Sequence, residues 1–324
     1  MSSFDESVFG VFGEAIIDLL PTKKGNLKPN PGGSPYNVAR ALGKQGMPVS
    51  YLSPLSQDHL GDVLENQLLT DGVLVDEDFR VSKPTSLAVV QLDDDGIPSY
   101  SLYREGIADR EYDAQDILNR IPLFMRLLHT GSLAVVPEDI SRVIEIIETL
   151  KSRDILISID FNFRPNIVQD HRAYVRGLET LVPYCDLLKA SDEDLHMMGY
   201  RQSFDELASR FLTQMDRGIV VFTRGEKGAF LYNQKHQVEF EGFGVALVED
   251  TVGAGDSFQA GLLSALHQKY SLDKTKMSNA SPAGLAQVLH WACACAAINI
   301  TRQGCNPPNS QETIAFLEAQ DIPA

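Results

Sequence analysis

Ten residues in the C-terminal third of the chain combine the groups that phosphoryl transfer needs: Glu249-Asp250-Thr251-Val252-Gly253-Ala254-Gly255-Asp256-Ser257-Phe258. Gly253 and Gly255 can take positive φ and leave the backbone bare, so consecutive NH groups at a helix start can bind one anion. Asp256 would stand at that positive helix end, where an ionised carboxylate can take a proton from an attacking hydroxyl. The pattern predicts a general base beside an anion-binding turn.

The sequence on either side of this turn predicts the elements that hold it. The apolar run 245–248 before the turn is typical of a short buried strand. After the turn, four residues recur at every fourth position, the spacing of one helix face: Phe258, Leu262, Leu266 and Tyr270. We therefore expect the turn to join a strand to a helix. A second interpretation stays open from the residues alone, in which Asp256 only caps the helix.

The composition of the 324 residues is that of a globular protein, with 44% hydrophobic and 22% charged residues. The formal net charge of -16 opposes binding to nucleic acid or anionic membranes, because both require a basic surface. The first six residues include the acids Asp5 and Glu6 where a signal peptide would be basic, and no later apolar run looks long enough to span a membrane. We expect a soluble, cytoplasmic protein.

The cysteines and histidines predict no metal site of their own. Four cysteines are too few and too scattered for a disulfide framework, so we expect reduced thiols: Cys185, Cys293, Cys295 and Cys305. Cys293 and Cys295 lie in a helical segment and face different directions, which favours core packing over a metal pair. No two of the seven histidines are four residues apart, so no zinc site can be argued from their spacing. Any metal should arrive with a nucleotide.

Short apolar runs alternate with amphipathic segments along most of the chain. The predicted strands are 8–13, 127–128, 156–159, 187–188 and 219–222, and the predicted helices include 33–43, 140–150 and 204–212. This rhythm is typical of a doubly wound α/β fold with a mostly parallel central sheet flanked by helices. Residues 87–103 break it, because two β-prone arms surround the turn Asp93-Asp94-Asp95-Gly96. We expect an antiparallel hairpin there that serves as a lid.

A second motif, Pro31-Gly32-Gly33-Ser34-Pro35-Tyr36-Asn37-Val38-Ala39, has the chemistry of a sugar site. Glycines let a backbone approach a sugar closely, and the Asn37 amide both donates and accepts hydrogen bonds. Taken alone, the motif also fits a loop followed by a helix cap. Asp18 is a carboxylate among apolar neighbours after the first predicted strand, where a hydrogen-bonding role is expected.

Together these motifs resemble the signatures of the PfkB (ribokinase-like) carbohydrate kinases. Residues 250–256 match the pattern D-T-x-G-A-G-D, and residues 32–39 match G-G-x-x-x-N-x-A. The residues found at 32–39 are most similar to those of the fructokinase branch. The resemblance spans nearly the whole chain, with the motifs in the expected order. It implies a single ribokinase-like kinase domain over residues 1–324, in which inserted segments of about 19–31 and 84–108 form a small β-sheet lid.

The resemblance implies roles for individual residues in catalysis and in binding the sugar. Asp256 corresponds to the catalytic base, and the backbone NH groups of Gly253, Ala254 and Gly255 would hold the transferred phosphate. Asp256 would also contact the sugar, together with Asp18, Gly32, Gly33, Asn37 and Arg104. Arg104 belongs to Tyr103-Arg104-Glu105-Gly106-Ile107-Ala108-Asp109, which resembles a fructokinase segment that closes over the substrate. An exposed arginine at a strand end is the alternative.

The nucleotide site implied by the resemblance departs from the family pattern at one motif. Ser191 and Asp194 replace the Asn and Glu of N-x-x-E, so Asp194 would reach Mg²⁺ only through water, and a solvated acidic helix start is the alternative. Nucleotide-binding roles are implied for Ser191, Thr223, Gly225, Gly228, Gly253 and Gly255. The backbone of Asp250 and Val252 would contribute to a loop that binds K⁺ in some relatives.

The strand end Asp160-Phe161-Asn162-Phe163-Arg164-Pro165 resembles the family's D-x-N-x-R-P. Asp160 and Asn162 would approach the site from the carboxyl edge of the sheet, whereas Arg164 fits a structural ion pair equally well.

The expected activity is that of an ATP-dependent sugar kinase that uses Mg²⁺, and fructokinase is the leading expectation within this class. The partners are ATP and a small sugar, and a homodimer is compatible with the family. Within the family, 2-keto-3-deoxygluconate kinase, ribokinase and nucleoside kinase are alternatives, and a catalytically silent regulatory protein is the non-enzyme alternative. A dinucleotide-dependent oxidoreductase is disfavoured, because Gly10-Val11-Phe12-Gly13 lacks the G-x-G-x-x-G spacing.

Overall fold

The computed structural model describes residues 6–21, 26–92 and 98–322. A nine-stranded sheet forms its centre, in the order β15-β14-β13-β12-β11-β10-β1-β4-β6. All neighbouring pairs from β6 to β13 are parallel, and β14 runs antiparallel to both of its neighbours. The strands are β1 Phe9–Val11, β4 Val49–Tyr51, β6 Leu74–Val75, β10 Leu127–Gly131, β11 Leu156–Asp160, β12 Leu187–Ser191, β13 Ile219–Thr223, β14 Ala229–Tyr232 and β15 Gln237–Phe240.

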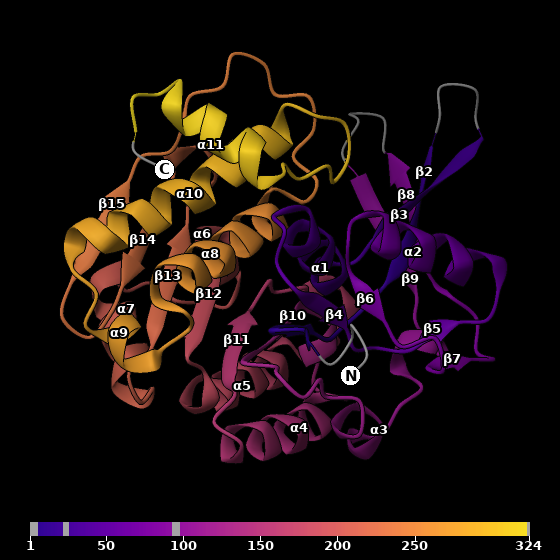
Figure 1. The fold of residues 1–324 in the computed structure, drawn as a ribbon. Coiled ribbons are helices and arrows are strands. Elements are labelled where there is room, and N and C mark those ends of the chain that lie inside the picture. Colours follow the sequence, from indigo (N-terminus) through magenta and orange to yellow (C-terminus); the bar gives the residue numbers. More distant parts are fainter. Residues whose placement is uncertain (1–5, 22–25, 93–97, 323–324) are drawn as a thin grey trace.

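Helices cover both faces of this sheet (Figure 1). One face packs against α1 Ser34–Lys44, α8 Ala254–Tyr270 and α10 Pro282–Ile300, and the other against α4 Ile140–Ser152, α5 His171–Leu181 and α7 Phe204–Gln214. Alternate strand residues divide between the two cores, as Leu127 and Leu128 of β10 do. The remaining helices are α2 His59–Thr70, α3 Ala114–Leu118, α6 Asp192–Met197, α9 Lys274–Ser278 and α11 Ser310–Glu318. The predicted doubly wound α/β class is confirmed.

A separate four-stranded sheet has the order β3-β2-β8-β9 and stands at one end of the molecule (Figure 1). Its strands are β2 Ile16–Pro21, β3 Leu27–Gly32, β8 Ser86–Leu92 and β9 Pro98–Tyr103. β8 and β9 pair antiparallel, which confirms the predicted hairpin, while its turn, including 93–96, lies outside the described residues. β5 Leu55–Ser56 and β7 Arg80–Val81 form a short parallel pair.

The strand predicted over residues 245–248 is wrong. This segment follows β15 without regular structure, and its apolar side chains are exposed, Leu247 to 69% and Val248 to 50%. The NH groups of Glu249 and Asp250 donate to the carbonyl of Ile300 at the end of α10, so the main chain is held by a helix terminus rather than by a strand. Residues 245–248 are apolar but are not buried, and composition alone does not distinguish an exposed apolar run from a buried strand.

No apolar run is predicted to be long enough to span a membrane, but one helix is long and apolar enough to do so by length and composition. Helix α10 has 19 residues and a mean hydropathy of 1.4. However, 67% of its most apolar window is buried inside the protein, and the helix packs along α8 (Figure 1). Cys293 and Cys295 are buried within it, as predicted for core residues. We interpret α10 as a core helix.

Candidate active site

Helix α8 begins at the glycine turn that the sequence singled out. Gly253 is its N-cap in the left-handed conformation, with φ 74, which confirms the predicted positive φ. A Cβ at Gly253 would overlap the sulfur of Cys305 and lie 3.1 Å from the Cα of that residue. Gly255 was predicted to take positive φ as well, but it lies inside the helix. Its missing side chain instead leaves open the space beside the Lys189 ammonium group.

The carboxylate of Asp256 faces helix α1. Its Oδ1 accepts a hydrogen bond from Ser34 Oγ at 2.7 Å, and its Oδ2 accepts one from Asn37 Nδ2 at 2.9 Å. Among the described residues, neither oxygen accepts a hydrogen bond from the backbone of α8, and the N-cap of this helix has no side-chain capping bond. The carboxylate therefore joins the two sequence motifs, and none of these contacts caps helix α8.

Burial and hydrogen bonding act in opposite directions on the acidity of Asp256. The side chain is only 8% exposed, and this desolvation raises its pKa. The hydrogen bonds from Ser34 and Asn37, and the charges of Lys189 and Arg164, favour the ionised form and lower the pKa in part. The arrangement keeps a carboxylate dry and more basic than usual, which suits a group that must accept a proton.

A glycine and a buried glutamate shape the start of helix α1. Gly33 is the N-cap with φ 106, and a Cβ there would overlap the carbonyl oxygen of Glu14. Glu14 Oε1 accepts a hydrogen bond from the NH of Ser34 at 3.1 Å. Because the hydroxyl of Ser34 in turn donates to Asp256, Glu14 is linked to the predicted base through a single residue.

Further polar side chains converge beside α1. Arg104 is not an exposed strand end: its side chain is 11% exposed, pairs with Asp109 Oδ2 at 3.6 Å and donates to the carbonyl of Leu133. Several buried atoms of this group have no hydrogen-bond partner among the described residues: Glu14 Oε2, Asn37 Oδ1, Arg104 Nε and both carboxylate oxygens of Asp109. A cluster of unpaired donors and acceptors of this kind suits a ligand with many hydroxyl groups.

Asp18 lies elsewhere than predicted. It does not follow the first strand of the main sheet but sits within β2 of the small sheet, opposite Asn30 of β3 and Ala88 of β8. Burial raises its pKa to about 6. A Cβ at Gly32 would overlap its Oδ2, so this glycine leaves room for the carboxylate. Gly32 and Asp18 are thus brought together, as two predicted sugar-binding residues should be.

Three residues of this site were missed as candidates from the sequence: Glu14, Ser34 and Asp109. Ser34 and Asp109 lie inside motifs that the sequence singled out, but nothing marked them beyond that. Glu14 is 2% exposed and Asp109 is 5% exposed. For Glu14, which lies between Gly13 and Ala15, the usable signal is a carboxylate without polar neighbours, because such a group is rarely buried without a function or a partner.

The residues predicted for the nucleotide side follow the carboxyl ends of three neighbouring strands, β11, β12 and β13. Lys189 Nζ pairs with Asp160 Oδ2 at 2.5 Å, and both side chains are buried. Thr223 ends β13. Beyond it, Gly225 and Gly228 have φ 55 and 80, and a Cβ at Gly228 would overlap the carbonyl of Phe240. The loop between these glycines is therefore tightly folded against β15.

Asp194 is held in place by backbone groups. Its Oδ2 accepts a hydrogen bond from the NH of Ser191 and its Oδ1 one from the NH of Phe163, both at 2.8 Å, and the NH of Asp194 donates to Ser191 Oγ. Ser191 and Asp194 thus form a capping box at the start of α6. Each carboxylate oxygen retains a lone pair for water.

Arg164 and Asn162 follow the end of β11. Arg164 has no ion pair within the part of the chain that the structure describes, so the structural alternative for it is not supported. It is exposed. Its charge acts on Asp256, and it is therefore free to meet an anion at the site. Asn162 has φ 38, a conformation that asparagine tolerates better than most residues.

The loop 249–252 is tied to the segment after α10. The carboxylate of Asp250 accepts hydrogen bonds from the NH groups of Val252 and Gly304, and the carbonyl of Val252 accepts one from Asn299 Nδ2 at 2.8 Å. No group of three or more histidine, cysteine, aspartate or glutamate side chains that could hold a metal occurs in the described ranges.

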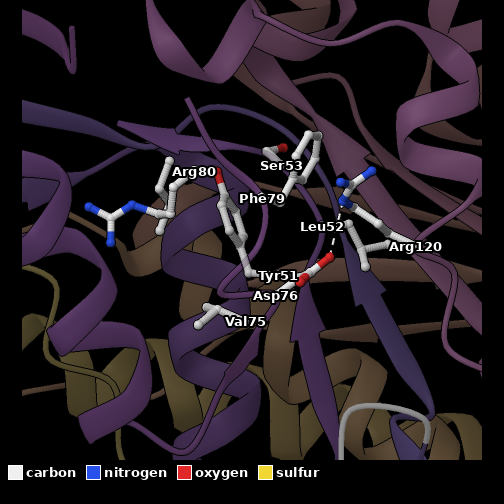
Figure 2. Close-up of a pocket in the computed structure, with 9 residues that line it drawn as sticks. Tyr51, Leu52, Ser53, Val75, Asp76, Phe79, Arg80 and Arg120 are labelled. Carbon is white, nitrogen blue, oxygen red and sulfur yellow. Dashed lines mark ion pairs between the residues drawn. The ribbon is translucent and has the colours of Figure 1, made fainter. Parts of the chain in front are cut away.

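The enclosed cavity in Figure 2 is not this site. Its volume is about 10 Å³, which holds at most about one water. Arg120 pairs there with Asp76 at 3.0 Å and stacks on the ring of Phe79 (Figure 2). Tyr51 also lines it, and its hydroxyl donates to the carbonyl of Gly13. We interpret the cavity as structural packing.

A family model for the pfkB family of carbohydrate kinases matches residues 10–312 of this chain. The chain is a member of the PfkB family. Fructokinase from Rhizobium leguminosarum bv. trifolii is 31% identical to this PfkB protein over 272 residues, which cover 82% of each chain.

Two solved structures resemble this PfkB chain over almost its full length. Fructokinase with bound ATP from Xylella fastidiosa has a TM-score of 0.84 and 26% identity, and the match covers 97% of this chain and 98% of that one. Fructokinase from Vibrio cholerae O395 in its fructose, ADP and calcium ion bound form has a TM-score of 0.81 and 27% identity, covering 97% and 99%. This PfkB protein is therefore an ATP-dependent carbohydrate kinase with a ribokinase-like fold.

The buried Glu14 makes a testable contribution to stability. Burial raises its pKa from 4.5 to about 7, against the opposing charge of Arg104. Because the folded pKa is the higher one, the folded state favours the protonated form, and stability is lost as the pH rises from about 4.5 through about 7. Glu14→Gln removes this loss. The difference in free energy of unfolding, variant minus wild type, should become more positive by up to about 3 kcal/mol between pH 4 and pH 8.

Chemical denaturation at several pH values measures this difference. Glu105→Gln is the matched control, because it makes the same chemical change at an exposed position, where there is no burial of the carboxyl group to disfavour its charge. A Glu14→Gln difference that stays flat from pH 4 to pH 8 would show that Glu14 folds without a raised pKa.

Proposed function

We propose that this kinase is a fructokinase, which transfers the γ-phosphoryl group of ATP to D-fructose and gives ADP and fructose 6-phosphate. The observation that carries the proposal is the contact of Asp256 with Ser34 and Asn37, which places a buried carboxylate between the helix start of α8 and the glycine motif of α1. The choice of fructose is supported by relatives named fructokinase, one of them solved with fructose and ADP bound.

Asp256 would act as the general base. It would accept the proton of the attacking hydroxyl while the sugar is held by Asp18, Asn37, Arg104 and the backbone at Gly32 and Gly33. The NH groups of Gly253, Ala254 and Gly255 would receive the charge that develops on the transferred phosphoryl group. Because the reacting groups are positioned before any bond changes, the barrier falls through orientation and electrostatics.

The nucleotide would lie along the loop ends that contain Ser191, Thr223, Gly225 and Gly228. Mg²⁺ bound with ATP screens the negative charge of the phosphates. Asp194 fits a water-mediated contact to this ion, since its oxygens already accept backbone hydrogen bonds. The backbone of Asp250 and Val252 fits K⁺ binding, since the side chain of Asp250 is engaged in shaping the loop.

The sheet β3-β2-β8-β9 would form the lid of a single kinase domain over residues 1–324, with its inserted segments at about 19–31 and 84–108. The position of Asp18 in β2 supports this role, since the carboxylate belongs to the small sheet and yet is mostly buried. Excluding water above the sugar would protect the phosphoryl group from hydrolysis. We further propose a cytoplasmic location, where ATP and free sugars are available.

A substrate screen tests the proposed activity. ADP release would be measured with fructose, 2-keto-3-deoxygluconate, ribose and adenosine, with and without Mg²⁺ and K⁺. We expect fructose to give the highest kcat/KM and the reaction to require Mg²⁺. A clear preference for another of these substrates would replace the proposed sugar, and no turnover with any sugar would favour a catalytically silent member of the family.

A further inference from the structure

The chain between β9 and α3, residues 104–113, carries Arg104 and Asp109 of the sugar side of the site. We call it the return segment, because it leads from the small sheet back to the main body of the protein. Both carboxylate oxygens of Asp109 lack a hydrogen-bond partner among the described residues, and its ion pair with Arg104 spans 3.6 Å, which is longer than a hydrogen bond. The position of Asp109 must therefore be set by the main chain on either side of it.

Residues just before and within α4 hold this main chain at several points. Arg104 Nη1 donates to the carbonyl of Leu133 at 3.3 Å, at the beginning of the segment. Further along, Arg142 Nη1 donates to the carbonyl of Arg110 at 3.2 Å and to that of Tyr112 at 2.6 Å. The Cζ atom of Arg142 also lies over the Tyr112 ring, 3.9 Å from its centroid. The return segment is thus anchored at both ends.

Asp139 completes this anchor. It is the N-cap residue of α4, but its side chain makes no capping hydrogen bond, which is the usual role of an aspartate at this position. Its Oδ1 instead pairs with Arg142 Nη2 at 2.6 Å and its Oδ2 with Arg110 Nε at 2.9 Å, and the residue is only 5% exposed. Because Arg110 follows Asp109 directly in the chain, this contact acts on the neighbour of the unpartnered carboxylate.

We propose that Asp139, Arg110 and Arg142, which we call the Asp139 cluster, are positioning residues for the sugar site. They hold the return segment so that Asp109 and Arg104 face the sugar, and none of the three is a residue that we assign to the sugar or to the nucleotide. The planar fork of an arginine suits this task, because it reaches two carbonyl oxygens and a carboxylate at once. The inference rests on the proposed function and adds to it residues that act on the substrate only through others.

The decisive variant is Arg142→Gln, which removes the hydrogen bonds to the carbonyls of Arg110 and Tyr112. Steady-state ADP release would be measured with the sugar that has the highest kcat/KM in the substrate screen. We expect kcat/KM for this sugar to fall by at least about tenfold, because a displacement of about 1 Å can cost about 100-fold. KM for ATP should stay within about twofold of the wild type, since the return segment carries no residue that we assign to the nucleotide.

A double-mutant cycle with Asp109→Asn separates positioning from general stabilisation. If Arg142 acts through Asp109, then Arg142→Gln should lower kcat/KM for the sugar by no more than about threefold in the Asp109→Asn background, because the effects of residues that act through one another are not additive. A residue that only stabilised the fold would cause the same loss in both backgrounds.

Arg210→Gln is the matched control. Arg210 of α7 also pairs with an acid, Glu179 of α5 at 2.7 Å, and its Cζ lies 5.6 Å from the centroid of the Tyr200 ring. Its replacement should leave kcat/KM for the sugar at the wild-type value. Melting temperature and far-UV circular dichroism would show that each variant is folded. If Arg142→Gln does not fold, Asp139→Asn keeps the shape of the side chain, weakens the hold on the same segment and should lower kcat/KM in the same way.

Two results would overturn the inference. One is a folded Arg142→Gln whose kcat/KM for the sugar lies within about twofold of the wild type, and the other is an equal loss with and without Asp109→Asn. Failure of the proposed function is different, since the wild type would then release no ADP with any sugar. In that case the Kd of fructose, measured by calorimetry without ATP, takes the place of kcat/KM, and the same weakening of at least about tenfold is expected. A wild type that binds no sugar would overturn the inference too.

Discussion

Replacing Asp256 with asparagine is expected to lower kcat by at least about 100-fold, because general-base catalysis typically contributes about 100-fold to 10,000-fold. The amide of asparagine can still accept from Ser34 at one end, but it cannot take a proton from an attacking hydroxyl. Nucleotide affinity and melting temperature should stay near those of the wild type, since asparagine and aspartate are similar in size. Steady-state ADP release with saturating fructose measures the change.

Asp273→Asn provides a control for the alternative that Asp256 is a cap. Asp273 is a true N-cap, whose side chain accepts from the NH of Lys276 at the start of α9. Asparagine caps a helix about as well as aspartate, so this variant should retain full activity and nearly full stability. A folded Asp256→Asn enzyme that keeps more than about a tenth of wild-type kcat would refute the assignment of Asp256 as base.

Replacing Gly253 with alanine is the second change with a large expected effect. Gly253 has φ 74, and an added Cβ would overlap the sulfur of Cys305 and lie 2.7 Å from its Cβ. The turn must then move, and the NH groups that we propose receive the phosphoryl charge move with it. Removal of one such donor typically costs about 100-fold to 1,000-fold in kcat. We expect a loss of at least about 100-fold, measured by the same assay, together with a lower melting temperature.

The Gly304→Ala variant separates the effect of the steric clash at Gly253 from the effect of strain in a left-handed backbone. Gly304 is also left-handed, with φ 66, but an added Cβ would meet nothing within 4 Å. Its replacement should cost about 1 kcal/mol of stability, as for a strained left-handed residue, and leave kcat within about twofold. If Gly253→Ala behaved no worse than Gly304→Ala, the close packing of Cys305 on the turn would have no catalytic importance.

Helices and strands could be predicted from the sequence where the apolar residues of the pattern are buried in the fold. The strands β10 to β13 are short apolar runs and are buried, and helix α8 has its predicted apolar face buried at Phe258, Leu262 and Leu266. The prediction failed at residues 245–248, whose apolar side chains face outward near the start of α8. Local sequence reports hydrophobicity, but whether a partner covers a segment is decided by the rest of the fold.

The candidate site likewise contains some residues that the sequence predicted and others that it did not. The residues of the two glycine motifs were predictable, because glycine and aspartate at a helix start have specific physical uses. Glu14 and Asp109 were missed, because their importance comes from burial beside Arg104, and the sequence does not reveal burial. Asp18 was singled out at the end of the first strand of the main sheet but lies within β2 of the small sheet, since a chain that leaves the main sheet for a small one keeps the same apolar pattern.

Asp256 lies far along the chain from the side chains that donate hydrogen bonds to it, since 222 positions separate Ser34 from Asp256. During synthesis, helix α1 leaves the ribosome long before α8 exists, and Cys305, which packs against Gly253, follows later still. A nascent chain therefore contains helix α1 without Asp256 for most of translation. Under the proposed mechanism, a growing or prematurely terminated chain that lacks α8 has no general base and cannot consume ATP by this route.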